Sequence, residues 1–382
     1  MRLKLFLALW LFSLASAQKV FTPTTLYNFQ APAYVDISHD GTEMAAILQN
    51  KLLLLEGEDL AFNTLKQQID TTDMPIEVEY SSSDQHLFVI EIDFPTACRA
   101  SLYLRNSSGL LNDSFSTSNP DTCYSGTFIQ EENLALLGVG NDVLVYEVNL
   151  TSKNFTQVKR IPMPSPAYSL KFYGGDKFAA LTFVNGNLSL VTRSIDTNEG
   201  SMVASAIVRS PFSLRMNDGL GFVAFPFNQT LVKVYSVDGL TLNEVNSFVV
   251  DVGQIGYVSI SEDGSVAMVS GSEHTQISGI HTQTFTSKVG GSTGHLIGAD
   301  NNHFYLTTPA GELKLFVECG PVGRDYSLDG GGHCTICDPN CQNCINGTHC
   351  EECVGEEEYV KDGNGGCRHC DDAREYYENG DC

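Results

Sequence analysis

The stretch Ala33–Ile69 reads AYVDISHDGTEMAAILQNKLLLLEGEDLAFNTLKQQI, and four short segments suited to β-strands follow one another in it. Turn residues separate these segments, first at His39-Asp40-Gly41 and then at Gln49-Asn50. Asp, Asn and Gly favour tight hairpins because they tolerate a backbone with positive φ. The apolar runs between the turns are short, which favours strands over a buried helix. The stretch therefore predicts a small sheet made of two hairpins and an outer strand.

The same succession recurs about every 40–50 residues, a period typical of propellers and solenoids. The innermost strand of each copy can be followed along the chain, which gives seven candidates: Tyr34–Ser38, Ile76–Tyr80, Thr127–Gln130, Tyr168–Phe172, Phe212–Met216, Tyr257–Ser261 and His295–Gly298. Proline has no N–H and suits the entry to a strand. Four of the seven strands follow one closely, namely Pro32, Pro75, Pro166 and Pro211.

The last copy has only three strands, and its missing outer strand is found at the other end of the chain. Val20–Phe29 has the character of an outer strand, and we expect it to pair with Glu312–Val317. This pairing closes a seven-bladed ring and satisfies the hydrogen bonds that an open array exposes. A stack of sheets that never closes is the alternative. Deleting Val20–Phe29 should therefore unfold or aggregate the domain.

The chain has 382 residues, 12 cysteines and a net charge of −24, enough for one large β domain and a small appendage. Residues 1–17 are typical of a signal peptide, with a basic start, an apolar core and a small-residue cleavage site. We expect a propeller over residues 18–318 and a tail over 319–382. No later segment is long and apolar enough to cross a membrane. The mature chain is expected to be secreted, extracellular or at the cell surface, unless it is a fragment of something longer.

Seven Asn-x-Ser/Thr sequons predict N-linked glycans and support secretion: Asn106, Asn112, Asn149, Asn154, Asn187, Asn228 and Asn346. No sequon falls in the predicted sixth, seventh and first blades. Close protein contacts tend to avoid bulky glycans, so we hypothesise that this bare arc is the main protein-contact surface. Chance clustering of the sequons is the alternative. The acidic balance and scattered Lys and Arg residues argue against nucleic acid as a partner.

The cysteines divide between the two predicted domains. Cys98 and Cys123 are the only cysteines in the ring, are expected in loops on the same face of neighbouring blades, and are predicted to form a disulfide. The other ten form the tail: Cys319, Cys334, Cys337, Cys341, Cys344, Cys350, Cys353, Cys367, Cys370 and Cys382. Zinc or iron–sulfur binding is the alternative for such spacings, but export favours disulfides. Spacing alone does not give the connectivity.

No catalytic, cofactor-binding or metal-binding residues are predicted. The sequence contains no phosphate loop, zinc-protease motif or EF-hand loop. Ser38-His39-Asp40 has catalytic residue types, but adjacent residues in a turn do not form a triad. Asp36, Asp40, Asp263 and Asp300 are candidates to line the channel of the ring and hold a cation, although a metal site is not the favoured interpretation.

Two family resemblances follow from these residues. The Ser-x-Asp-Gly turns at Ser38–Gly41 and Ser261–Gly264 resemble those of WD40-like and lactonase-like seven-bladed propellers, although the WD dipeptide is absent. The spacing over Cys334–Cys353 resembles furin-like and EGF-like cysteine-rich repeats. A secreted, acidic, glycosylated propeller with such a tail is similar to protist cell-surface proteins, among them the subunits of tubular flagellar hairs (mastigonemes).

Three functions remain open from the sequence. The first is a structural subunit of an extracellular filament or coat, assembling through contacts of the propeller and the tail with itself or related subunits. The second is a soluble adhesion or ligand-binding module. The third is a lactonase-like enzyme, which would need clustered carboxylates and histidines at the channel mouth. A fold resemblance does not choose among them, because function lies in sites rather than in folds.

Overall fold

The computed structural model describes residues 20–28, 34–38, 40, 42–58, 61–93, 97–205, 222–260 and 266–279, and ten later strands up to residue 369. Every regular element among these residues is a β-strand. The chain divides into two compact units. The larger unit comprises residues 25–281 and 288–315, and the smaller comprises residues 1–24, 282–287 and 316–382. The signal peptide predicted over residues 1–17 lies outside the described residues and remains a prediction, as do the domain boundaries.

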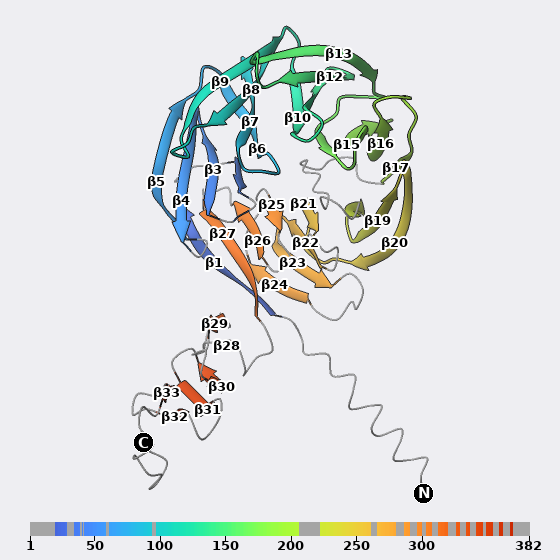
Figure 1. Cartoon of the computed structure of the whole chain (residues 1–382). Helices are drawn as coiled ribbons and strands as arrows, with labels where there is room; N and C mark the ends of the chain where they lie inside the picture. Colours follow the sequence, from blue (N-terminus) through green and yellow to red (C-terminus); the bar gives the residue numbers. More distant parts are fainter. Residues whose placement is uncertain are drawn as a thin grey trace, which may run out of the picture. The chain divides into compact units, whose positions relative to one another are not determined.

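Six four-stranded antiparallel sheets form the blades of a β-propeller (Figure 1). The first four are consecutive in the chain: β2 (Tyr34–Ile37), β3 (Glu43–Leu48), β4 (Lys51–Glu58) and β5 (Ala61–Asp70); β6 (Met74–Tyr80), β7 (His86–Asp93), β8 (Ala97–Arg105) and β9 (Leu111–Asn119); β10 (Cys123–Ile129), β11 (Leu134–Val139), β12 (Asp142–Asn149) and β13 (Asn154–Pro162); β14 (Ser169–Phe172), β15 (Lys177–Val184), β16 (Asn187–Ser194) and β17 (Met202–Ala204).

The remaining two four-stranded sheets end the ring. One contains β21 (Ile255–Ile260), β22 (Val266–Gly271), β23 (His274–Gly279) and β24 (Thr286–Gly290), and the other has the order β1-β27-β26-β25, from β1 (Val20–Asn28), β27 (Glu312–Cys319), β26 (His303–Thr307) and β25 (Leu296–Ala299). The predicted pairing of the N-terminal strand with the last strand of the propeller is thus confirmed. Within the larger unit, β25 also contacts β2, which brings the last and first blades together.

The number of complete blades is six, not the seven expected. Between the fourth blade and β21 lies a sheet of three described strands: β18 (Phe222–Asn228), β19 (Leu231–Asp238) and β20 (Thr241–Val249). The inner strand predicted for this copy, Phe212–Met216, lies outside the described residues. Among the described residues this sheet therefore has three strands, and the six complete blades are counted over the same residues.

The apolar runs of the sequence become strands that are buried on both faces. Successive side chains of a strand point to opposite faces, so a strand between two neighbouring sheets must be apolar at nearly every position. In β4, Leu52 and Leu54 pack in a cluster with Val78 and Leu87 of the next blade, and all four are fully buried or nearly so. Further clusters between successive blades have the same composition. The core is thus a set of apolar layers between blades.

The Ser-x-Asp-Gly turn has a hydrogen-bonding role in the first blade. The Ser38 hydroxyl donates to Asp40 Oδ1 over 2.7 Å, and its oxygen accepts from the Glu43 backbone N–H over 2.9 Å. Asp40 Oδ1 also accepts from the backbone N–H of Thr42 over 3.0 Å. Because these bonds tie the turn to the start of β3, the motif positions Glu43 at the strand entrance.

The tail contains three two-stranded sheets: β28 (Tyr326–Leu328) with β29 (Cys334–Ile336), β30 (Cys341–Asn346) with β31 (His349–Cys353), and β32 (Tyr359–Lys361) with β33 (Cys367–His369). In the second of these, Cys341 is opposite Cys353 and Cys344 is opposite Cys350. The predicted disulfide-rich module is not confirmed, because the side chains of the tail cysteines are outside the described residues.

Candidate functional site

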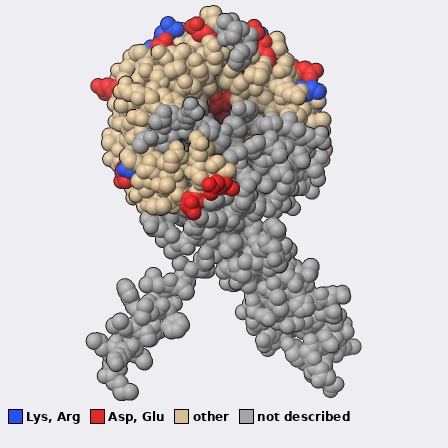
Figure 2. All heavy atoms as spheres, turned by 180° about the vertical axis from the view of Figure 1, so that it is seen from behind, with Lys and Arg blue, Asp and Glu red and all other residues tan. Residues whose placement is uncertain are grey.

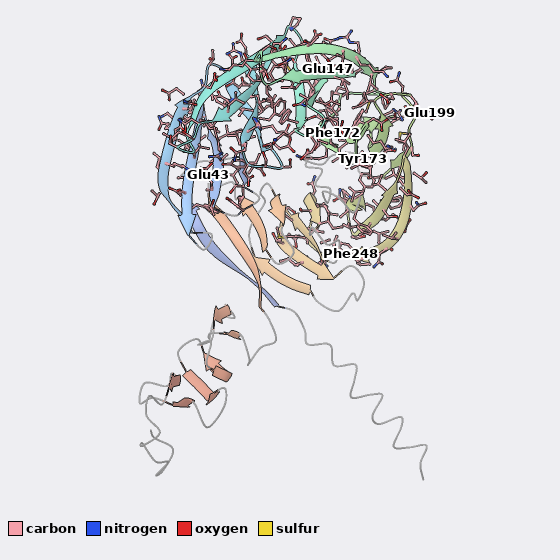
Figure 3. The ribbon with its side chains drawn as sticks, viewed as in Figure 1. Glu43, Glu147, Phe172, Tyr173, Glu199 and Phe248 are labelled. Carbon is pink, nitrogen blue, oxygen red and sulfur yellow. A yellow bond between two sulfur atoms is a disulfide. The ribbon has the colours of Figure 1, made fainter. Side chains whose placement is uncertain are left out.

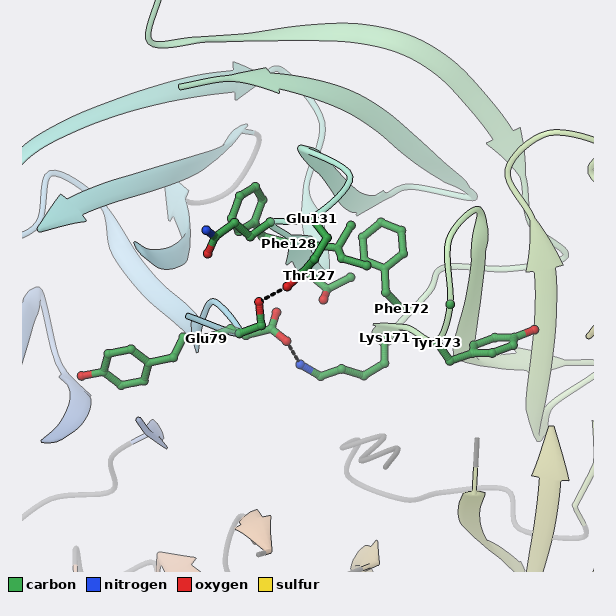
Figure 4. Close-up of a pocket in the computed structure, with 12 residues that line it drawn as sticks. Glu79, Thr127, Phe128, Glu131, Lys171, Phe172 and Tyr173 are labelled. Carbon is green, nitrogen blue, oxygen red and sulfur yellow. Dashed lines mark hydrogen bonds and ion pairs between the residues drawn. The ribbon is translucent and has the colours of Figure 1, made fainter. Parts of the chain in front are cut away.

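A cavity of about 260 Å³ opens where the inner strands of the second, third and fourth blades end. Its lining comes from the last residues of β6, β10 and β14 and from the turns that follow these strands (Figure 4). The side chains of Glu79, Glu131 and Lys171 bring charge to the cavity, while Phe128 and Phe172 bring apolar rings. The cavity is therefore small, partly apolar and charged.

An ion pair between Glu79 and Lys171 crosses the cavity (Figure 4). Glu79 belongs to β6 and Lys171 to β14, so the pair joins the second and fourth blades past the inner strand of the third. Each side chain is about 15% exposed. The other carboxylate oxygen of Glu79, Oε2, is buried and has no hydrogen-bond partner. The carboxylate is thus only half satisfied, and such a buried oxygen gains from any donor that reaches it.

The rim of the cavity is more exposed than its floor. Glu131 follows β10 and accepts a hydrogen bond from the hydroxyl of Ser82, which follows β6. The neighbouring Gln130 accepts from the hydroxyl of Ser83 and lies 3.3 Å from Nδ1 of His86. These contacts hold the two turns together. They leave the Glu131 carboxylate without a cation among the described residues.

Other inner-strand carboxylates tie neighbouring blades to each other. Asp36 Oδ2 accepts from the backbone N–H of Tyr80 over 2.8 Å, and Glu77 Oε2 accepts from that of Gly126 over the same distance. Figure 2 shows Asp or Glu atoms deep in the hollow at the middle of the ring. Acidic residues of the inner strands therefore join neighbouring blades, and acidic side chains also lie in the hollow.

A second charged group, the Glu43 cluster (Glu43, Arg105, Lys66 and Tyr80), lies between the first and second blades. The Glu43 carboxylate, 5% exposed, is bound by Arg105 through both oxygens, by Lys66 over 2.9 Å and by the Tyr80 hydroxyl over 2.7 Å. Arg105 also donates to the carbonyls of Asp84 and Gly109 over 2.6 and 2.8 Å. The cluster thus satisfies a buried carboxylate with donors from two blades.

The Glu43 cluster shifts the acidity of its members. Burial raises the pKa of Glu43, but the bonds from Arg105, Tyr80 and Lys66 outweigh it and hold the pKa below the usual value. For Arg105, burial lowers the pKa, and the bonds and charge of Glu43 raise it above its usual value. Burial, followed by the charge of Glu43, raises the pKa of the Tyr80 hydroxyl well above its usual value. All three groups therefore keep their usual charge at neutral pH.

The buried carboxyl group of Glu91 in β7 has fewer hydrogen-bond and charge partners than that of Glu43. It is 1% exposed, its Oε1 has no hydrogen-bond partner, and its Oε2 lies 4.0 Å from Arg99. Burial raises its pKa to about 7; the Arg99 charge opposes this, and Asp73 adds to it. Glu91 therefore exchanges its proton near neutral pH.

Cys98 and Cys123 form a disulfide with their Cα atoms 5.5 Å apart. Both residues were expected in loops, but they lie within strands, Cys98 in β8 and Cys123 as the first residue of β10. The reason is that β8 pairs with strands on both sides up to Cys98, opposite Ile92 and Asn119. The bond joins the second and third blades inside a buried apolar cluster.

The sequon asparagines lie at turns and strand ends. Asn149 and Asn154 are directly opposite each other at the end of the β12–β13 hairpin. The remaining positions are the turn between β8 and β9 (Asn106), β9 (Asn112), the start of β16 (Asn187), and the ends of β18 (Asn228) and β30 (Asn346). Glycosylation at these sites stays a prediction.

Of the four candidate aspartates, the structure describes Asp36 and Asp40, and it does not place these two in a metal-binding group. Asp36 is engaged with Tyr80 and Asp40 with its own turn, while Asp263 and Asp300 lie outside the described residues. Where side chains are described, three or more His, Cys, Asp or Glu residues do not gather in a way suited to a metal ion. The same part of the chain contains no helix long and apolar enough to cross a bilayer.

The cavity residues were missed by the sequence reasoning, although a signal for them exists. The inner strands containing Glu79 and Lys171 were predicted correctly as strands. A charged residue in such a strand, next to apolar neighbours, indicates a side chain that faces the channel. What the pattern does not give is which charged residues from different blades meet.

Comparisons with known proteins agree with the fold and go no further. No protein-family model matches the sequence, and no curated protein matches it. Among solved structures, the β-propeller domain of Cps50 (Swd1) from Myceliophteria thermophila is similar, with a TM-score of 0.60 and 10% sequence identity. The match covers 78% of this chain and 99% of that chain. At this identity the likeness shows the fold alone: the chain contains a β-propeller.

Proposed function

We propose that the chain is a secreted, glycosylated structural subunit of an extracellular filament or cell-surface coat. The observation that carries the proposal is the Cys98–Cys123 disulfide, which crosslinks two adjacent blades inside the core. Such bonds persist in oxidising compartments and are rare in reducing ones. The predicted signal peptide, the sequons and the cysteine-rich tail support the same location.

The way the propeller uses its charged groups also supports a structural role. Asp36, Glu43 and Glu77 each accept hydrogen bonds from the neighbouring blade. These bonds and the disulfide make the blades resist relative movement. A rigid body of this kind suits a subunit that bears mechanical load or sets the distance between its neighbours. A crosslinked tail would contact the next subunit. Head-to-tail contacts whose rotation does not close produce open filaments.

Finer parts of the proposal extend the resemblance. The three-stranded sheet β18–β20 would gain an inner strand from Phe212–Met216 and become a seventh complete blade. The tail would be a furin-like or EGF-like disulfide module. The whole would be similar to the subunits of tubular flagellar hairs, with self-assembly or related subunits as its partners.

A ligand-binding or adhesion module is the second candidate, and the cavity at the ends of β6, β10 and β14 favours it. The two functions differ in whether the purified native protein assembles with itself. We would purify the protein under non-reducing conditions and examine it by size-exclusion chromatography with light scattering and by negative-stain microscopy. Filaments or regular oligomers support the structural subunit. Dispersed monomers at all concentrations would refute it and leave the ligand-binding module.

The secretory location is tested separately. The chain expressed with its own N-terminus in a eukaryotic secretory host should appear in the medium, lose mass on enzymatic removal of N-glycans, and contain no titratable thiol at Cys98 or Cys123. Retention in the cytosol with free thiols would contradict the proposal.

A further inference from the structure

The cavity at the ends of β6, β10 and β14 contains one positive charge fewer than its carboxylates need. Glu79 and Glu131 are both among its lining residues, and Lys171 is the single cation. Lys171 is bonded to one oxygen of Glu79, and the Glu131 carboxylate accepts a hydrogen bond from the Ser82 hydroxyl. Figure 4 shows the three charged side chains directed toward the same space. A ligand that supplies a second positive charge would complete this arrangement.

The shape of the cavity restricts the size of that ligand. Pockets for drug-sized molecules measure about 300–1,000 Å³, and this one is smaller, about 260 Å³. It suits one side chain or a small amine rather than a cofactor. The rings of Phe128 and Phe172 line the same space and are 6% and 7% exposed. An apolar wall beside carboxylates matches a group with a methylene stem and a cationic end.

Other classes of ligand fit less well. An anion would have to displace Glu79 from Lys171 and approach Glu131. A divalent metal prefers several carboxylate or carbonyl oxygens at close range, and here a lysine ammonium lies among the carboxylates. An ammonium or guanidinium needs only directed acceptors, which Glu131 and the unpartnered Oε2 of Glu79 provide once Oε2 is uncovered.

We propose that this cavity is a binding site for an ammonium or guanidinium group on a short methylene stem, such as the side chain of a lysine or arginine from another protein. The cationic end hydrogen-bonds to Glu131 at the rim and approaches Glu79 beneath it, and the stem lies against Phe128 and Phe172. The proposal depends on the cavity alone and holds whether or not the protein forms filaments.

Saturation-transfer NMR on the secreted, full-length protein tests the site. The probes are Nα-acetyl-arginine amide, Nα-acetyl-lysine amide, the uncharged Nα-acetyl-glutamine amide, and putrescine as a free amine. We expect saturation of the arginine and lysine side-chain methylenes and none for the glutamine probe. Binding should weaken in 0.5 M salt, since charge attraction is screened. Preference for the amino-acid probes over putrescine indicates a protein side chain, and equal binding indicates a free amine.

Three variants separate the site from general attraction to an acidic protein. Glu131→Gln should weaken binding at least fivefold, and its exposed position makes misfolding unexpected. Glu147→Gln removes the same charge from an exposed side chain of β12 at the outer rim of the ring (Figure 3) and should change binding less than twofold. Lys171→Met removes the competing ammonium and should tighten binding about threefold. The proposal is overturned if the glutamine probe binds equally, if Glu131→Gln and Glu147→Gln behave alike, or if folded Lys171→Met binds more weakly.

Discussion

Replacing Arg105 by methionine should remove the main support of the buried Glu43 carboxylate. Arg105 is 9% exposed and donates to both oxygens of Glu43 and to two backbone carbonyls. Methionine retains most of the apolar stem, so the loss is one of charge and hydrogen bonds. Breaking a buried ion pair costs about 3–5 kcal/mol. We expect the lower end, about 3 kcal/mol, because Lys66 and Tyr80 still donate to Glu43.

Circular dichroism during urea and thermal unfolding is the assay, since the only tryptophan, Trp10, lies in the predicted signal peptide. For a domain of this size, 1 kcal/mol corresponds to about 2–4 °C in Tm, so Arg105→Met should lower Tm by about 6–12 °C. Arg160→Met is the matched control. Arg160 is 56% exposed and pairs with Asp142 over 3.3 Å, so its loss should cost less than about 1 kcal/mol.

The double variant Glu43→Gln/Arg105→Met tests whether the effect belongs to the pair. If it does, the double variant loses less stability than the sum of the single variants, by at least about 1.5 kcal/mol. Additive losses of stability would show that this ion pair does not stabilise the contact between the first two blades. The same conclusion would follow if the free energy of unfolding of Arg105→Met were within about 0.5 kcal/mol of that of the parent protein.

Three further predictions concern other sites. Burial raises the pKa of Glu91 from about 4.5 to about 7, so the folded protein should lose about 3 kcal/mol of stability as the pH rises through this range. Glu91→Gln should flatten this pH dependence in thermal melts, and an unchanged slope would contradict the assignment. Replacing Cys98 and Cys123 by serine should lower the free energy of unfolding by about 3 kcal/mol, and an unchanged urea midpoint would rule out a stabilising role. Asn149 and Asn154 are cross-strand neighbours with Cβ atoms about 5 Å apart, so glycopeptide mass spectrometry should find one glycan on this hairpin, and a doubly occupied peptide would disprove the steric argument.

Most strands of the propeller could be predicted because their signals are local. A turn such as Gln49-Asn50 and an apolar run such as Leu52–Leu55 act within a few residues, and burial on both faces forces the run to be apolar. The pairing of Val20–Phe29 with Glu312–Val317 could also be inferred, although the segments are far apart. Because the last copy of the repeat has only three strands, its fourth strand must come from another part of the chain.

The limits of local signals are visible in the same chain. The predicted count of seven complete blades was wrong for the described residues, which contain six and a three-stranded sheet. The cysteines of the ring were expected in loops, because a loop was inferred from the period rather than from hydrogen bonding. Strand ends depend on what the neighbouring strands pair with, and this is set by tertiary contacts.

The sequence by itself determined a repeated antiparallel β architecture and the residues of its layers, because alternation and turn chemistry operate over a few residues. Only the tertiary structure decided that Glu79 meets Lys171, 92 positions away, and that Glu43 meets Arg105. Such meetings depend on the angle and order of whole blades around the ring. A charged residue in a strand shows that something must satisfy it, but not which residue of another blade does.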